Sequence, residues 1–368
     1  MLNKWSRLVK SALVLTLTIC ASVAKSQTQI QPITPADAKP SFIPKEFFIA
    51  GLMDARTDRV NSVSLLLTAT KGVGPAIVKT NIKDGAVLAL TQFFRHNLPS
   101  NTALHPIIIR INELSISETA STAGYAQGEI KLGFTFMLKR RFDTVKLVNY
   151  AGGVAYVRPI AQPDMIGPTL GSALMGSLSW FNTWINKQAD NNILLAKSVS
   201  VTFSDYSEKG ESDTIYYDVK RPLTWNDFRA KQTDARFDAS VMPGFGYSES
   251  VKLSKGVIHV NFTIKTYLPK SASWADESKV GSYALNHEQR HFDIAKIITE
   301  RYKRKMKDEH YTVEDYDGPV ASGYFEFFRM MNQMQKQYDA ETRHGSNTEA
   351  QNEWDAKIDA ELKSYGVK

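Results

Sequence analysis

The segment from His287 to His291 reads HEQRH, and it constrains this chain of 368 residues more than any other. Histidines four residues apart lie one above the other on one face of a helix, so that both imidazoles can reach the same cation. Glu288 is rotated by roughly 100° from the first histidine and can lean toward a water on that cation as a general base. We therefore predict a helix that carries a metal site.

The residues around this segment support a helix with a buried face. Seven positions share helical spacing and predict an inward stripe: Ala284, His287, His291, Ile294, Ala295, Ile298 and Tyr302. Unpaired histidines on such a stripe are costly to bury, and a metal ion supplies the missing partner. Surface histidines, or core histidines with other partners, are the alternative interpretation.

A catalytic zinc site needs three protein ligands and one open position for water. The candidates for the third ligand lie in the following helix or just beyond the first: Glu326, Asp339, Glu341, His344 and His310. We favour His344, because the helix is expected to end at the next glycine and the imidazole can project from the loop. The alternative role for His344 is a C-terminal cap that interacts with the helix dipole.

The first 26 residues predict a secretory signal peptide. Lys4, Arg7 and Lys10 precede an apolar run from about Ser11 to Ala24, and cleavage is expected after Ala24 or Ser26. We therefore expect an exported protein, periplasmic or extracellular. No later stretch approaches about 18 uninterrupted apolar residues, so no transmembrane segment is expected after signal removal.

Cys20 is the single cysteine and lies inside this signal. Lipidation of Cys20 is the alternative, but the residue before a lipidated cysteine is normally small and Ile19 is not. Without Cys20 the mature chain has no disulfide, thiol nucleophile or thiolate ligand. A metal ion must then be held by His, Asp or Glu.

The charge of the chain excludes one class of partner. The formal charge of +7 falls to +4 when Lys4, Arg7 and Lys10 leave with the signal, which is a mild excess. Aromatic and basic residues do not alternate in a recognisable motif, so we expect no nucleic acid as a partner.

The pattern along the chain predicts two α+β domains. Residues 27–44 lack periodicity and are expected to form a flexible spacer. Residues 45–190 predict an antiparallel sheet flanked by helices, with strands at about 62–70, 106–117, 129–138 and 144–150 and helices at about 84–95 and 169–188. Its topology resembles small periplasmic auxiliary domains of envelope transport lipoproteins, which implies an envelope protein as a partner.

Residues 196–368 predict a domain with a small sheet followed by helices. Strands are expected at about 197–206, 213–221 and 255–268, and helices at about 278–307, 319–342 and 349–364, with the HExxH segment in the first helix. With the HExxH segment in its first helix, we expect a zincin-like domain.

Three segments of this half carry a resemblance. They are LTWNDF (Leu223–Phe228), NHEQRHFDIA (Asn286–Ala295) and YDAETRHG (Tyr338–Gly345), followed by Gln351 and Trp354. They resemble a bacterial family of predicted secreted zinc-dependent proteases, catalogued as domain of unknown function 922. The resemblance covers roughly residues 200–368, the C-terminal half only.

The resemblance implies that His287 and His291 bind Zn²⁺, that Glu288 is the catalytic base and that His344 is the third ligand. Together with the motif it predicts an exported zinc metallopeptidase of HExxH type, a hydrolase whose substrate is protein or peptide. Asp293 is a candidate for orienting a ligand imidazole, and Tyr338 or His310 for stabilising an oxyanion.

Two functions of other classes remain open. One is a zinc-stabilised binding module without turnover, and the other is an envelope scaffold whose C-terminal domain is degenerate. Glu288 distinguishes an enzyme from these two alternatives, because a purely structural site has no need of a general base beside its first ligand.

Overall fold

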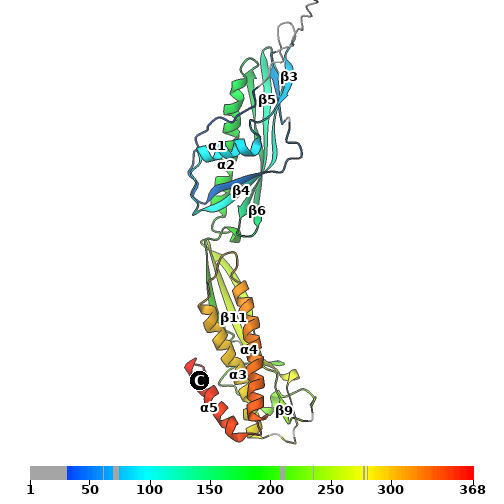
Figure 1. Ribbon diagram of the computed structural model, residues 1–368, viewed down its shortest axis with the longest axis vertical. Helices are drawn as coiled ribbons and strands as arrows, with labels where there is room; N and C mark the ends of the chain where they lie inside the picture. Colours follow the sequence, from blue (N-terminus) through cyan, green and yellow to red (C-terminus); the bar gives the residue numbers. More distant parts are fainter. Residues whose placement is uncertain are drawn as a thin grey trace, which may run out of the picture.

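The computed structural model describes residues 31–60, 62–68, 74–207, 212–234, 236–276, 278–279 and 281–368. The expected signal peptide and Cys20 lie outside these residues. The described chain forms two units placed end to end, each with its own sheet and helices (Figure 1). One hydrophobic core runs from Ile33 to Leu195 and the second begins at Ala196.

The N-terminal unit is built on a six-stranded sheet of order β3-β2-β4-β5-β6, with β1 also paired to β4. The strands are β1 (Phe47–Asp54), β2 (Val63–Leu67), β3 (Ala76–Thr80), β4 (His105–Ala120), β5 (Tyr125–Lys139) and β6 (Thr144–Pro159). The expected antiparallel sheet is wrong in one respect, because β1 and β2 run parallel to β4 and the sheet is mixed. Strand β1 was not predicted, since its apolar run FFIAGLMD lacks the alternation of a half-buried strand.

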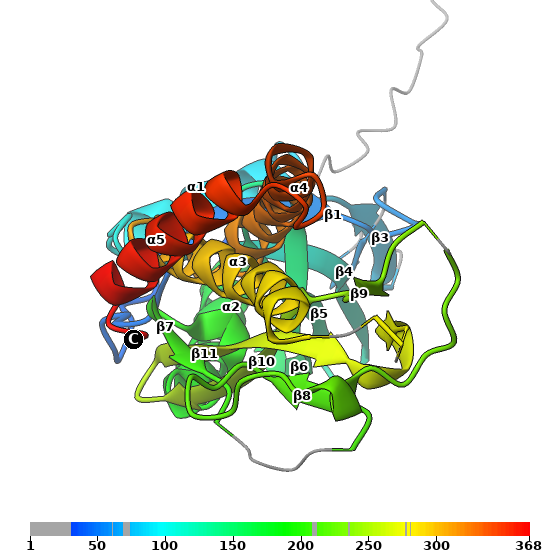
Figure 2. The same ribbon diagram turned by 90° about the horizontal axis from the view of Figure 1, so that it is seen from below.

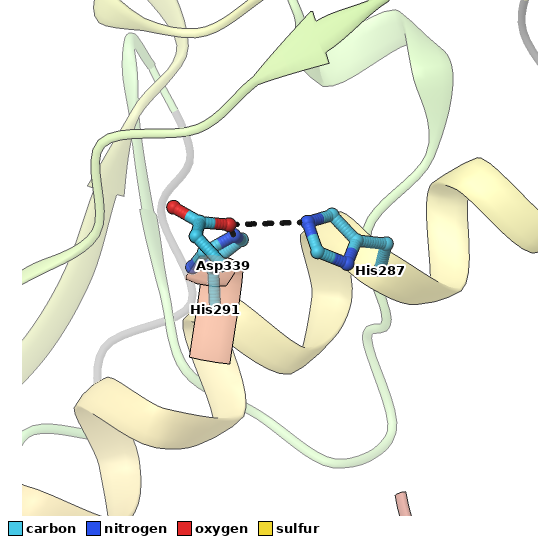
Figure 3. Close-up of side chains that lie close together, drawn as sticks. All are labelled: His287, His291 and Asp339. Carbon is cyan, nitrogen blue, oxygen red and sulfur yellow. Dashed lines mark ion pairs between the residues drawn. The ribbon is translucent and has the colours of Figure 1, made fainter. Parts of the chain in front are cut away.

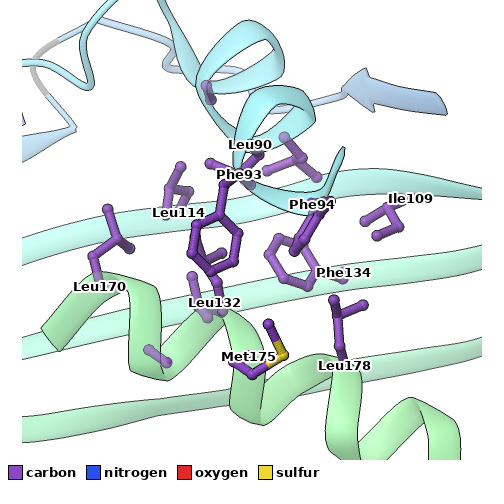
Figure 4. Packing of buried hydrophobic residues seen from close by; sticks show 14 of the residues in the cluster. Leu90, Phe93, Phe94, Ile109, Leu114, Leu132, Phe134, Leu170, Met175 and Leu178 are labelled. Carbon is purple, nitrogen blue, oxygen red and sulfur yellow. The ribbon is translucent and has the colours of Figure 1, made fainter. Parts of the chain in front are cut away.

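Helices α1 (Ala86–Asn97) and α2 (Ile166–Gln188) complete this unit. Residues of both helices and of strands β4 and β5 meet in one core (Figure 4). The apolar residues of α2 recur every three or four positions and are buried, as a helix with one inward face requires. Phe181 is fully buried and stacks on Phe136, with ring centroids 4.0 Å apart.

The segment expected to be a flexible spacer is fixed to the N-terminal unit from Ile33 onward. Ile33 forms a parallel bridge with Ile82 and is nearly buried. The N–H of Ala36 donates to the carbonyl of Gly167 at 3.0 Å, and the N–H of Ala38 donates to the side chain of Asn97 at 3.1 Å. These backbone bonds need no apolar periodicity, and the sequence pattern therefore gave no sign of them.

The C-terminal unit begins with a smaller mixed sheet. It has the order β10-β11-β7, with β8 also paired to β11, and a separate pair joins β9 to β12. The strands are β7 (Ser198–Asp205), β8 (Thr214–Tyr216), β9 (Ala239–Ser240), β10 (Gly244–Ser254), β11 (Val257–Pro269) and β12 (Trp274–Ala275). The expected strands at 197–206, 213–221 and 255–268 contain β7, β8 and most of β11, whereas β10 was not predicted.

Three helices follow, α3 (Ser282–Lys307), α4 (Gly318–Thr342) and α5 (Thr348–Ser364), within two residues of the predicted bounds at nearly every end. Helix α3 contacts the sheet as well as α4 and α5 (Figure 2). Because it is covered on several sides, even its charged residues are largely buried, and the HEQRH segment lies in this covered part. No helix in the described ranges is long and apolar enough to cross a membrane.

The LTWNDF segment forms a tight turn ahead of β9 in the chain. Its centre is a short 3-10 helix (Trp225–Asp227) with a reciprocal cap between Thr224 and Asp227. Asp227 also accepts two hydrogen bonds from Arg221, at 2.7 and 2.8 Å. The role of this motif is therefore structural in the described fold.

Candidate metal centre

His287 and His291 lie one turn apart on α3, with 6% and 8% of their surface exposed. A third side chain, Asp339, comes from the last turns of α4 and points between the two rings (Figure 3). Its Oδ1 lies 3.3 Å from Nε2 of His287 and 3.0 Å from Nε2 of His291. The three side chains each offer one ligand atom within 4.8 Å of the others, so the group could hold a metal ion.

A glutamine side chain contacts the Nδ1 atom of each imidazole. Nδ1 of His287 lies 3.0 Å from Oε1 of Gln351, and Nδ1 of His291 contacts Oε1 of Gln335. The Nε2 of Gln351 donates to Asp355 and the Nε2 of Gln335 donates to a backbone carbonyl, and both of these partners only accept. The amide orientations are thereby fixed, so that each glutamine presents its oxygen to the histidine.

The glutamine oxygens determine the tautomer of the two histidines. An oxygen acceptor requires a proton on Nδ1, which leaves Nε2 of each neutral ring with a lone pair directed at Asp339. Oδ1 of Asp339 is buried and receives no hydrogen bond, although both Nε2 atoms are close. With both rings neutral, three electron-rich atoms converge on one point, and a cation there would relieve the repulsion. A protonated ring would instead donate from Nε2 to Oδ1 of Asp339.

The packing of α4 on α3 produces this geometry. Gln335 and Asp339 are one turn apart on α4, so that one supports an imidazole and the other completes the group. Tyr338 lies between α3 and α5, stacks on the ring of His287 at 4.7 Å and exchanges hydrogen bonds with Gln351. These contacts fix the position of the His287 ring from two sides.

Glu288 is 5% exposed and lies beside the group rather than in it. Burial raises the pKa of its carboxyl group, which His291 and His287 only partly offset, and Asp339 adds to the rise. A backbone hydrogen bond from Val241, in the segment after β9, also reaches the carboxylate. A buried carboxylate with a raised pKa is suited to accept a proton.

The charges of the group are coupled. Burial alone would lower the pKa of His291, but Asp339 and Glu288 outweigh it and the net shift is upward. Burial would raise the pKa of Asp339, but His287 and His291 outweigh it and lower that pKa strongly. Asp339 is therefore a carboxylate, the form that binds a metal ion.

His344 is near the group without belonging to it. Its Nδ1 is 3.5 Å from Oδ1 of Asp339, and half of its side chain is exposed. Arg343, His344 and Gly345 all have positive φ, so the end of α4 turns in the left-handed region. The ring of His344 lies 4.4 Å from that of Phe237, at the open side of the group.

The remaining candidates for the third ligand lie elsewhere. Glu341 accepts hydrogen bonds from Trp354 and Gln337. Glu326 and His310 are exposed and are not members of the group. Asp339, which the sequence offered as one candidate among five, is the residue that the fold brings to the two histidines.

The residues expected to support the site also have other partners. Asp293 is buried and accepts hydrogen bonds from Tyr217 and Arg290 rather than from a ligand imidazole. Tyr338 bonds to Gln351, as described, and does not face open solvent. The actual supports, Gln335 and Gln351, were not assigned from sequence, and the one available signal was that Gln335 precedes Asp339 by one helical turn.

Comparison with known proteins leaves the family open. No family model matches the chain, and no curated protein matches it. One solved structure with some similarity is that of protein XCC0632 from Xanthomonas campestris, described by the family model DUF330. It is 11% identical, covers 43% of this chain and 95% of its own, and has a TM-score of 0.26.

Proposed function

We propose that the protein is an exported zinc-dependent hydrolase that cleaves peptide bonds, with His287, His291 and Asp339 as the metal ligands. The observation that carries this proposal is the convergence of Nε2 of His287, Nε2 of His291 and the buried Oδ1 of Asp339, with Oδ1 3.3 and 3.0 Å from the two nitrogens. Two imidazoles and one carboxylate are a donor set that suits catalytic zinc and leaves one position open. The resemblance to the secreted zinc-dependent proteases supports the same conclusion.

Glu288, Gln335 and Gln351 would have different roles in hydrolysis. Zinc bound here supplies a Lewis acid that activates water and polarises a carbonyl group. Glu288 would take a proton from the attacking water and pass it to the leaving amine, since it is the adjacent buried carboxylate with a raised pKa. Gln351 and Gln335 would keep the imidazoles in the tautomer and orientation that binding requires.

His344 fits the role of a hydrogen-bond donor to the substrate better than that of a ligand. Its ring is half exposed and stands on the open side of Asp339, against Phe237. A donor at the mouth of the site can stabilise the negative charge that develops on the oxygen of the scissile carbonyl. We therefore replace His344 by Asp339 as the proposed third ligand.

The proposal is tested with the mature protein, by metal analysis and by incubation with a mixed peptide library. We expect about one zinc ion per chain, and Glu288→Gln should keep the zinc and lower the turnover by about 10²–10⁴-fold. If Glu288→Gln cuts as well as wild type, hydrolysis with this base is refuted. Bound zinc without any cleavage would favour the zinc-stabilised binding module.

The choice between Asp339 and His344 needs a pair of variants. Asp339→Asn should lose zinc at concentrations that saturate the wild type, because the anionic ligand is gone. His344→Gln should retain zinc and lose turnover. The opposite pattern, in which His344→Gln loses zinc and Asp339→Asn keeps it, would restore His344 as the third ligand.

A further inference from the structure

Strand β1 has an open edge in the N-terminal unit. It pairs with β4 on one side, and the described part of the sheet contains no strand that pairs with its other side. The run from Phe47 to Met53, FFIAGLM, has no charged residue and no proline. Natural proteins usually protect an edge strand with charge, proline, a bulge or a cover, and an edge without them is a template for another strand. The one irregularity of β1 is a register shift between Ile49 and Gly51.

A groove follows this edge. It has a volume of about 710 Å³ and is lined by residues 48–52 of β1, by Phe94 of α1 and Leu98 directly after it, and by Pro106 at the start of β4. This volume lies within the usual range of ligand sites. The lining therefore combines apolar side chains with residues 48–52 of the strand whose edge is open.

The lining of the groove is also cationic. Four basic residues line it: Arg95, Lys139, Arg140 and Arg141. Arg140 is paired with Asp143 in the turn between β5 and β6, and Glu314 is the carboxylate among the lining residues. The cations exceed these two carboxylates, so the groove is complementary to an anionic occupant.

We propose that this β1 groove binds an extended acidic peptide segment of a partner protein, which adds to the open edge of β1 as a further strand. The backbone of the segment would bond to β1, alternate side chains would contact the apolar side chains of the lining, and its carboxylates would meet Arg95 and Arg141. An anionic lipid would match the positive charge of the groove, but it has no peptide groups that could pair with the open edge of β1. The first 30 residues of this chain carry four Lys or Arg and no acid, so they do not match the cationic lining.

The test uses the mature protein and a phage-displayed library of random dodecapeptides. We expect enrichment of peptides in which acidic residues adjoin a β-prone run. Arg95→Glu/Arg141→Glu should weaken the binding of these peptides by about tenfold, as the loss of two rim ion pairs implies. The control Lys79→Glu/Lys252→Glu makes the same change in charge at exposed positions that do not line the groove and should bind as wild type.

Hydrogen exchange locates the bound peptide. We expect slower exchange of the backbone amides from Phe48 to Leu52 when an enriched peptide is present. Failure to enrich acidic peptides, equal weakening in both charge variants, or unchanged exchange in β1 would each overturn the proposal. Binding of an anionic lysophospholipid without any peptide binding would assign the groove to lipid instead. Glu288→Gln should leave peptide binding unchanged, because the inference does not rest on hydrolysis.

Discussion

The hydrogen bond between His287 and Gln351 allows one prediction to be worked through in detail. Gln351 is fully buried, and its Oε1 accepts from Nδ1 of His287 at 3.0 Å. In Gln351→Leu this buried N–H has no acceptor, which costs about 1–3 kcal/mol, and the ring loses the bond that fixes its tautomer. Because a partner of this kind changes metal affinity by about 10–100-fold, we expect the Kd for zinc to rise by that factor, or about 1.4–2.7 kcal/mol.

The assay is competition for zinc with a chromogenic chelator at constant pH. Asn352→Leu is the matched control, because it makes a similar change on the exposed side of α5 and should leave the Kd unchanged. Circular dichroism checks that both variants are folded. If folded Gln351→Leu binds zinc as tightly as wild type, the glutamine does not orient His287 for a metal ion, and the reasoning about the tautomer fails.

Three further predictions concern stability. Burial would raise the pKa of Asp227, but hydrogen bonds led by that from Arg221 lower it to about 2. The stabilisation that Asp227 contributes is therefore present above the ordinary value of 3.8 and is lost as the pH falls through 2. In urea unfolding, Asp227→Asn should lower the free energy of unfolding more at pH 7 than at pH 2. Phe181→Ala removes a fully buried ring and should cost the N-terminal unit about 3–5 kcal/mol in chemical denaturation; a loss below 1 kcal/mol would contradict the packing. Arg158 and Glu118 form a fully buried ion pair, so Arg158→Met should cost about 3–5 kcal/mol and the added change Glu118→Gln should recover part of it.

Most of the secondary structure of the C-terminal unit could be predicted from the sequence. Helical spacing around His287 and His291 predicted the helix, its buried face and the side on which both imidazoles lie, because these are properties of neighbouring residues on one element. The antiparallel strands β4, β5 and β6 were predicted for the same reason. The parallel pairing of β1 with β4 was not, since it joins residues about 58 positions apart and leaves no local pattern.

In the candidate site, too, some features follow from the sequence and others only from the tertiary structure. The sequence by itself determined two histidines and a glutamate on one helix, and it determined that no thiolate was available once the expected signal is removed. Only the crossing of α4 over α3 decided that Asp339, rather than His344, meets the imidazoles, and only the position of α5 decided that Gln351 supports His287. The physical reason is that ligand convergence depends on the angle and the distance between helices, which are set by packing of the whole unit and not by the spacing of residues along any one helix.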